Sequence, residues 1–194
     1  KGAISGGIKR GSVVRELEPF DSPTQTVTVK NTGTKPIYGR VVTRGLVPAG
    51  EEKPLSGGLV LNVEYRDGEG NAIPLSSLAP GETFSIDVSV KNTFGKRIDN
   101  VALSVPVPTC WEFANERIGM ESDEDATSRD YDWRDIKDTY VHTYFSLDRD
   151  ATKSYRFTAT VAYKGSYYVP AIRAEAMYNA DIQAIVPGAF VGPR

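Results

Sequence analysis

Alternation of apolar and polar residues is the feature that most constrains the fold of this chain. It runs through residues 26–31, 59–65, 84–90 and 155–163, and it is clearest in "FSIDVSV" at 84–90. Successive side chains of a β-strand point to opposite faces, so an alternating run collects its apolar residues on one face. Each run therefore predicts an antiparallel strand that is buried on one side and solvated on the other.

Short polar segments separate these runs, for example "RDGEGN" at 66–71 and "NTFGKR" at 92–97. Gly, Asn and Asp favour turns because they tolerate left-handed backbone or bond to their own main chain. No window of comparable length has the spacing of an amphipathic helix. Many short strands joined by such turns predict an all-β fold, an antiparallel β-sandwich of the immunoglobulin-like kind.

The segment at 45–58, "GLVPAGEEKPLSGG", is rich in Pro and Gly and is the best candidate for a linker. Alternation predicts about three strands before it, too few to form a sandwich alone. It predicts about seven strands after it, which is enough for one closed sandwich. We therefore expect a partial β segment at 1–50 and a complete β-sandwich at 51–194. A single larger sandwich is the alternative.

Composition excludes several classes of protein. The net charge is −2 and the isoelectric point about 5.6, so the chain lacks the basic surface of a nucleic-acid-binding protein. No apolar run approaches the roughly 18 residues that a membrane span requires, so no direct membrane insertion is expected. The single cysteine, Cys110, excludes an internal disulfide framework.

The residues that could perform catalysis are few. Serine-nucleophile chemistry requires a base, and the only histidine, His142, lies in "TYVHTYFSL", where a structural role on a strand is the simpler interpretation. A reactive thiolate requires a positive neighbourhood, but Cys110 is followed closely by Glu112. We therefore expect no enzyme activity, no catalytic residues and no cofactor.

One long acidic segment, residues 112–138, departs from the alternating pattern. It contains Asp130, Asp132, Asp135 and Asp138, whose oxygens could in principle bind calcium. The spacing does not match an EF-hand loop, and Arg and Lys residues are interleaved with the acids. A solvated or salt-bridged loop is therefore favoured, and no metal site is predicted.

Aromatic residues suggest a second kind of function. Trp111, Trp133 and the pair Tyr167–Tyr168 could stack on sugar rings, although packing in the core or at its rim is commoner for such side chains. The alternative function is therefore a stand-alone immunoglobulin-like adhesion or carbohydrate-binding module of a secreted or surface protein. It predicts an exposed row of Trp133, Tyr167 and Tyr168.

Four motifs occur in a specific order: "LAPGETFSIDVSVKN" at 78–92, "WEFANER" at 111–117, "DIKDTYVHTYFSL" at 135–147 and "PAIRAEAMYN" at 170–179. With this combination the chain, from about residue 55 to its end, resembles the last macroglobulin-like domain of the bacterial α2-macroglobulins. The resemblance implies a macroglobulin-like β-sandwich in a protease-trapping inhibitor. This parent protein would act in the periplasm or cell envelope, with or without a lipid anchor. Residues before about 50 would belong to strands of the domain that flanks the thioester domain.

The resemblance also implies a mechanism. In this family a Cys and a Gln of a separate domain form an internal thioester, which bonds to a protease after the protease cleaves a bait region. Cys110 is not followed by Glu-Gln and stands where the family more often has a small residue, so the reactive bond lies elsewhere in the parent. The implied partners are the thioester domain and other domains of the same polypeptide, and target proteases through the parent.

The resemblance assigns a docking and shielding role to the segment "RAEAMY" at 173–178. The family has a methionine here that covers the thioester, and Met177 matches it. Met177 and Tyr178 are therefore expected to be apolar cover that keeps water from the acyl bond. Arg173 and Glu175 are expected to be polar contacts that hold the segment in register. The alternative is that Met177 caps the core and that the two charged residues form a surface pair.

Overall fold

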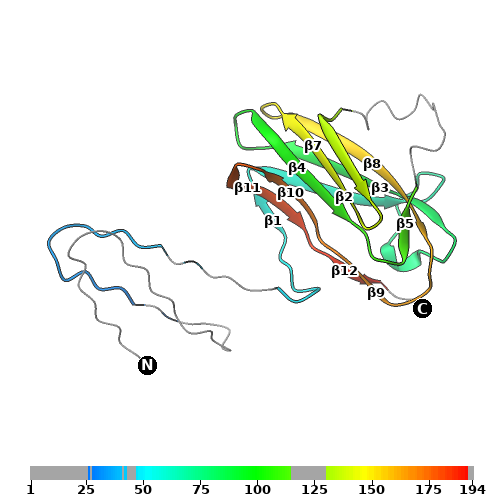
Figure 1. Cartoon of the computed structure of the whole chain (residues 1–194), viewed down its shortest axis with the longest axis horizontal. Coiled ribbons are helices and arrows are strands. Elements are labelled where there is room, and N and C mark those ends of the chain that lie inside the picture. The colour runs from blue at the N-terminus through cyan, green and yellow to red at the C-terminus, as the bar shows by residue number, and fades with distance from the viewer. Residues whose placement is uncertain (1–25, 27, 41, 43–46, 115–129, 192–194) are drawn as a thin grey trace. The chain divides into compact units, whose positions relative to one another are not determined.

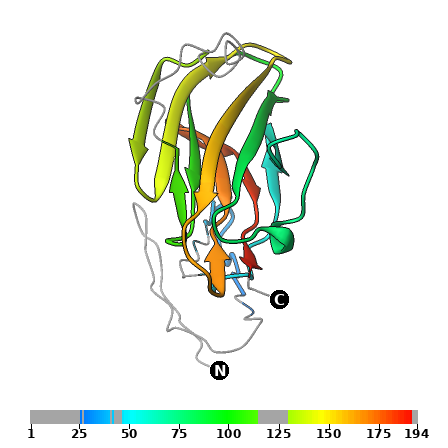
Figure 2. The ribbon, with the colours of Figure 1, turned by 90° about the vertical axis from the view of Figure 1, so that its right-hand side faces the viewer.

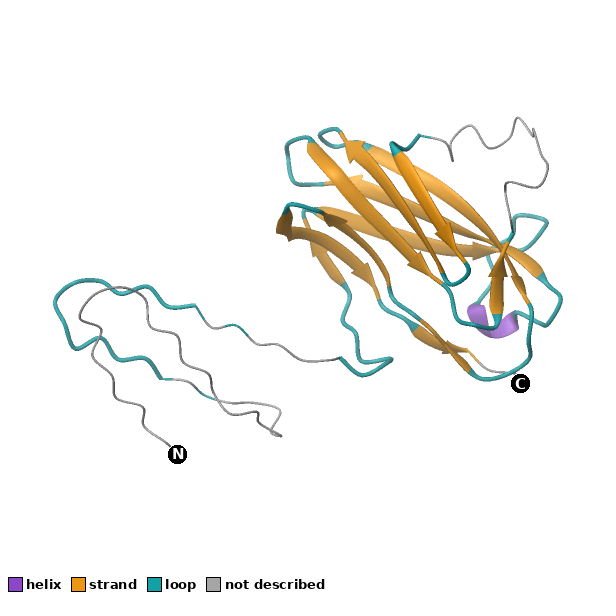
Figure 3. Cartoon of the chain, in the orientation of Figure 1, coloured by secondary structure: helices purple, strands orange, loops and turns teal. Residues whose placement is uncertain are grey.

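The structure is a computed structural model that describes residues 26, 28–40, 42, 47–114 and 130–191. The chain divides into two units, Lys1–Arg44 and Gly45–Arg194. The described part of the second unit is a β-sandwich with one short 3-10 helix, η1 (Leu75–Ser77) (Figures 1 and 3). The predicted fold class, an all-β antiparallel sandwich, is confirmed. No helix in the described part of the chain is long and apolar enough to cross a membrane.

One layer of the sandwich is a four-stranded antiparallel sheet. Its order is β2-β3-β8-β5, and the strands are β2 (Leu59–Arg66), β3 (Thr83–Asn92), β8 (Thr152–Val161) and β5 (Trp111–Phe113). β2 and β3 contain the alternating runs at 59–65 and 84–90, and β8 contains residues 155–161 of the run at 155–163, so these strands are confirmed.

The other layer is a six-stranded sheet in the order β1-β11-β10-β4-β7-β6. Its strands are β1 (Leu55–Gly57), β11 (Asn179–Val186), β10 (Ile172–Ala176), β4 (Ile98–Pro106), β7 (Tyr140–Leu147) and β6 (Trp133–Lys137). A two-stranded sheet pairs β9 (Tyr167–Val169) with β12 (Ala189–Val191). Figure 2 shows the two main sheets as layers.

The core lies between the two layers, where the apolar positions of facing strands meet. On β3 the buried residues alternate with polar ones, and Phe84, Ile86, Val88 and Val90 are almost fully enclosed. Aromatic rings fill the centre: Phe84 and Trp111 meet edge to face with centroids 4.8 Å apart, the geometry that aromatic pairs prefer. Burial raises the pKa of the Tyr65 hydroxyl, which borders this cluster, to about 12.

Most of the expected β segment at 1–50 lies outside the described residues, so that expectation stays a prediction. The described residues among 26–42 contain no strand, and Val29 in the alternating run at 26–31 is 68% exposed. A strand forms only where another segment pairs with its backbone, so alternation alone does not form one. The expected linker at 45–58 ends earlier than predicted, because residues 55–57 form β1 at the edge of the six-stranded sheet.

Candidate functional site

The predicted shielding residues lie at and near the turn between β10 and β11. Ala176 pairs with Asn179, so Met177 and Tyr178 form the two-residue turn, here called the hairpin tip. The side chain of Met177 is 50% exposed and that of Tyr178 is 83% exposed. Met177 therefore does not cap the core of its own sandwich, and the tip presents apolar surface to its surroundings.

A bulge in β4 holds the hairpin tip in place. The register between β4 and β7 shifts between Ile98 and Val101, and Asn100 within this bulge has a φ of 56°. In this left-handed conformation its carbonyl accepts a hydrogen bond of 3.0 Å from the backbone N–H of Met177. Asparagine tolerates this region better than most residues with a Cβ. The backbone of the tip is thus anchored while its side chains project outward.

The two charged residues of the predicted site lie on β10, away from the tip. Arg173 pairs with Ser104 of β4, and Glu175 pairs with Ala102 of β4, and both side chains point to the outer face of the six-stranded sheet. With a rise of about 3.4 Å per residue, Arg173 is about 14 Å from Met177 along the strand. Arg173 and Glu175 thus share a sheet face that leads to the tip, but they do not surround it.

A contact that sequence reasoning missed occupies the region around Arg173. The hydroxyl of Tyr168 on β9 donates a hydrogen bond to the carboxylate of Glu52, and Arg173 interacts electrostatically with both groups. The Tyr168 hydrogen bond lowers the pKa of Glu52, whereas partial burial and the nearby carboxylate raise the pKa of Tyr168. Because the two residues are 116 positions apart, no local sequence pattern could have identified the pair.

Neither residue considered for catalysis has the required surroundings. His142 lies on the outer face of β7 between Tyr140 and Tyr144, with ring centroids 4.5 and 6.3 Å away. Cys110 is buried, and burial raises the pKa of its thiol, so the protonated and unreactive form is favoured at neutral pH.

The acidic segment is only partly described, because residues 115–129 lie outside the described residues. Asp130 forms an ion pair of 2.8 Å with Lys153, and Asp135 forms one of 3.2 Å with Lys137. Within the described ranges, no group of three or more His, Cys, Asp or Glu residues could hold a metal ion. Asp130 and Asp135 thus engage basic side chains of the same unit.

The aromatic row of the carbohydrate-binding alternative is not formed. Trp133 lies on β6, an edge strand of the six-stranded sheet, whereas Tyr167 and Tyr168 lie on β9 of the small sheet. Tyr167 packs against the core, and Tyr168 contacts Phe190 with ring centroids 5.0 Å apart. The three side chains therefore cannot form one sugar-binding platform.

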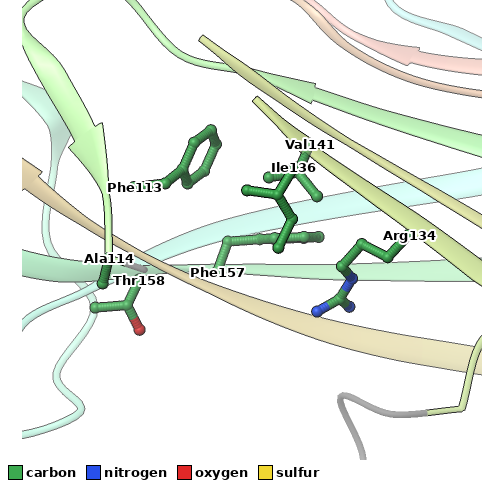
Figure 4. A pocket seen from close by; sticks show the side chains of 7 residues that line it. All are labelled: Phe113, Ala114, Arg134, Ile136, Val141, Phe157 and Thr158. Atoms are coloured by element: carbon green, nitrogen blue, oxygen red, sulfur yellow. The ribbon is translucent and has the colours of Figure 1, made fainter. Parts of the chain in front are cut away.

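A small pocket opens at the edge of the sandwich between β5 and β6 (Figure 4). It holds about 10 Å³, the space of a single water molecule. The guanidinium group of Arg134 reaches toward it and lies 4.3 Å from the ring centre of Tyr131 and 5.1 Å from that of Phe157. Such a pocket is too small for a substrate. Its lining residues are Phe113, Ala114, Arg134, Ile136, Val141, Phe157 and Thr158.

Comparisons with known proteins agree on one family. The family model described as "Bacterial Alpha-2-macroglobulin MG10 domain" matches residues 58–181. Among the similar solved structures is Salmonella alpha-2-macroglobulin reacted with methylamine, with a TM-score of 0.63 and 18% identity over 73% of this chain. The native Escherichia coli protein has a TM-score of 0.65 and 16% identity over 76% of this chain. No curated protein sequence matches the chain.

The chain corresponds to a small part of these proteins. It covers 10% of the Salmonella chain, 10% of the native E. coli chain and 25% of an E. coli structure that spans domain MG7 to the C-terminus. The family model matches more than half of the chain and ends within the strand that follows the hairpin tip. The β-sandwich of residues 55–191 also agrees with the fold of the solved relatives. The chain therefore belongs to the family of bacterial alpha-2-macroglobulin MG10 domains.

Proposed function

We propose that this unit is a non-catalytic domain of a protease-trapping inhibitor, which docks on the thioester domain of its parent polypeptide and shields the thioester. Met177 and Tyr178 cover the reactive bond, and Arg173 and Glu175 make polar contacts beside it. The parent acts in the periplasm or cell envelope, either with or without a lipid anchor. Residues 1–50 complete the sheet of a preceding domain in this proposal.

The observation that carries the proposal is the exposure of the hairpin tip on an anchored backbone. Two large side chains that can pack against a partner project from a turn whose main chain is hydrogen bonded to β4. A flexible, polarizable methionine adapts its shape to the surface that it covers. An acyl bond hydrolyses only when water can reach it, so close apolar cover prolongs its lifetime.

The solved relatives supply independent support. The Salmonella protein was solved after reaction with methylamine, and the E. coli protein was solved after activation by porcine elastase and by trypsin. A small primary amine is the reagent expected to open a thioester, and proteases are the expected targets of a trap. Carried over to this chain, both facts fit a domain that belongs to a thioester-containing inhibitor.

The proposal is tested by Met177→Ala in the full-length parent polypeptide. Shortening the Met177 side chain opens a path for water to the thioester. A decrease of about 1 kcal/mol in the activation free energy of hydrolysis corresponds to roughly fivefold faster hydrolysis. The measurement is the rate at which free thiol appears in the native protein, followed with a thiol reagent. Circular dichroism and thermal unfolding should be unchanged, because Met177 contributes little to its own core.

Tyr163→Ala is the matched control, because Tyr163 is 62% exposed and follows β8 at the opposite end of the sandwich. The thioester of the Tyr163→Ala variant should have the same lifetime as the thioester of the unsubstituted parent polypeptide. The shielding role would be refuted by a Met177→Ala protein whose thioester is as long-lived as that of the control.

A further inference from the structure

The segment that leads into the sandwich is seated on the small β9–β12 sheet. Residues 47–54, here called the entry strap, precede β1 and pass beside β12 (Figure 1). All of these residues are exposed except Glu52, which is half-buried. Their composition predicts a linker, yet the strap contacts β9 and β12 at defined points. These contacts make the strap a structural element of the second unit.

A turn gives the entry strap its shape. The backbone N–H of Glu51 donates a hydrogen bond of 3.1 Å to the carbonyl oxygen of Pro48, and Gly50 within this turn has a φ of 86°. A positive φ at the third residue of a turn is the type II arrangement, which favours glycine. At the same residue the strap approaches the sheet closely, because a Cβ on Gly50 would lie 2.9 Å from the ring of Phe190 on β12. Gly50 is therefore needed both for the turn and for the contact.

The carboxylate of Glu52 joins the entry strap to the sheet. One of its oxygens accepts a hydrogen bond from the Tyr168 hydroxyl on β9, and the other accepts one of 3.0 Å from the backbone N–H of Gly50. The Tyr168 hydrogen bond, together with the nearby Arg173, lowers the pKa of Glu52, so the carboxylate is ionised at neutral pH. Hydrogen bonds to an ionised acceptor are stronger than neutral ones. Glu52 thus couples the shape of the strap to its attachment.

The small sheet has room for this attachment at one position. Phe190 lies directly opposite Tyr168 in the register, and the two ring centroids are 5.0 Å apart. Gly188 precedes β12 at a point where a Cβ would overlap the Tyr168 hydroxyl and the carbonyl oxygen of Val169. A larger residue at this position would displace the hydroxyl from Glu52. The glycine therefore allows Tyr168 to reach the strap.

We propose that the entry strap is a two-state device. It is seated on β9 and β12 while Tyr168 holds Glu52, and it opens as a unit, with the sandwich still folded, when that hydrogen bond is broken. Eight residues of fully extended chain span at most about 27 Å. Opening therefore lengthens the reach of the connection to β1, which the seated strap keeps short and fixed. The proposal involves no residue of the hairpin tip and does not depend on the shielding role.

The burial of the entry strap favours local opening over unfolding of the sandwich. Regions with few buried apolar contacts open with free energies well below that of global unfolding. The strap has this character, because its one residue that is not exposed is the polar Glu52. Opening stops at Leu55, where β1 begins to pair with β11. The hydrogen bond to Tyr168, rather than buried apolar surface, therefore controls whether the strap is seated.

The test compares Tyr168→Phe with Tyr167→Phe in the 194-residue chain. Tyr168→Phe removes the hydroxyl that holds Glu52 and keeps the ring that packs against Phe190. Tyr167→Phe is the matched control on the same strand, because the Tyr167 hydroxyl donates to the carbonyl oxygen of Lys164, outside the strap. Both variants lose one hydroxyl group and retain an aromatic ring.

Hydrogen exchange measured by NMR reports on the amides of Gly50 and Glu51, which both donate hydrogen bonds within the entry strap. In Tyr168→Phe these two amides should exchange at least about fivefold faster, while amides in the centre of β3 keep their rates. In Tyr167→Phe the Gly50 and Glu51 amides should exchange as in the unsubstituted chain.

Three outcomes of the exchange experiment would overturn the proposal. Unchanged exchange at Gly50 and Glu51 in Tyr168→Phe would show that the hydroxyl does not hold the strap. Equal acceleration in β3 would show that the whole sandwich opens. Exchange of the two amides at unprotected rates in the unsubstituted chain would show that the strap is not seated.

A distance measurement tests whether the strap opens as a unit. Spin labels are attached at Ala49→Cys in the turn and at Lys91→Cys on β3, two exposed positions, with Cys110→Ala to remove the native thiol. Double electron–electron resonance should give a narrow distance distribution in this background and a broad one after Tyr168→Phe. A distribution that stays narrow in Tyr168→Phe, or is already broad without it, would overturn the two-state device.

Discussion

At the scale of single residues, two positions adopt a backbone conformation that is usually left to glycine. Asn100 and Asp150 are the residues other than glycine with positive φ in the described part of the chain, at 56° and 59°. Left-handed backbone places the Cβ close to a carbonyl oxygen, which costs about 1–2 kcal/mol for most residues. Of these two residues, Asn100 accepts a hydrogen bond from the backbone N–H of Met177. Its left-handed conformation therefore helps to position the candidate site.

Asn100→Val should lower the free energy of unfolding by about 1–2 kcal/mol, because a β-branched residue is strained at positive φ. It should also speed hydrogen exchange at the Met177 amide, whose acceptor would move. Urea denaturation and amide exchange measured by NMR check the two effects.

Asp150→Val is the control, because Asp150 has the same backbone conformation in a turn next to β8. It should lose similar stability but leave exchange at Met177 unchanged. Equal exchange at Met177 in both valine variants would show that Asn100 does not anchor the tip.

At the scale of the strands, an ion pair connects β3 and β8 on the outer face of the four-stranded sheet. The guanidinium of Arg156 donates two hydrogen bonds, of 2.7 and 2.8 Å, to the carboxylate of Asp87, and the two residues are directly opposite in the register. The hydrogen bond from Arg156 is the largest influence on Asp87 and lowers its pKa. Only 23% of the Asp87 side chain is exposed, so solvent screens the pair less than most surface pairs.

This pair predicts a pH dependence. Since the folded-state pKa of Asp87 is lower than its unfolded value of about 3.9, its stabilisation is present above that pH and is lost as the pH falls through the folded pKa. Asp87→Asn should therefore lower the free energy of unfolding at pH 7 by about 0.5–1 kcal/mol. Below about pH 4, the variant should lose less additional stability than the unsubstituted chain does. Urea denaturation at pH 7 and at several acidic values measures both effects.

Asp99→Asn is the control at an exposed pair. Asp99 is 62% exposed and contacts Arg97, so its removal should change stability at pH 7 by less than about 0.5 kcal/mol. If the stability of Asp87→Asn falls with pH in the same way as that of the unsubstituted chain, the pair of Asp87 and Arg156 does not stabilise the fold.

At the scale of the whole molecule, the two sheets are held together by side chains that meet between them. Phe145 of β7 and Tyr155 of β8 come from different sheets, and their ring centroids are 5.1 Å apart. Phe145 has no exposed surface. Removing its ring would leave a cavity that the surrounding strands can fill only partly.

Phe145→Ala should lower the free energy of unfolding by about 3–5 kcal/mol, through lost burial and the cavity that remains. Both sheets should unfold together, because the core is shared between them. Fluorescence of the core Trp111 and far-UV circular dichroism, followed in the same denaturant series, should give coincident transitions.

Phe190→Ala removes the same ring from a position that is 70% exposed, and it should change stability by about 0.5 kcal/mol or less. A comparable loss in the two variants would mean that the core between the sheets does not dominate stability.

The strands and the site were predictable to different extents. The alternating runs at 59–65 and 84–90, and residues 155–161 of the third run, became strands with the predicted buried faces, because the period of two is a property of each strand alone. The run at 26–31 has the same pattern, yet the described residues there form no strand, since pairing depends on segments outside the run. The roles of Arg173, Glu175, Met177 and Tyr178 stay predictions.

The sequence by itself determined that this chain is an all-β protein, which residues face the core, and, through its motifs, which family it belongs to. Those properties depend on local periodicity and on residue order. Only the tertiary structure decided that Met177 is anchored by Asn100, that Tyr168 meets Glu52, and that Arg156 lies opposite Asp87. These features depend on which strands become neighbours, and register between distant strands is set by packing of the whole sandwich rather than by any short segment.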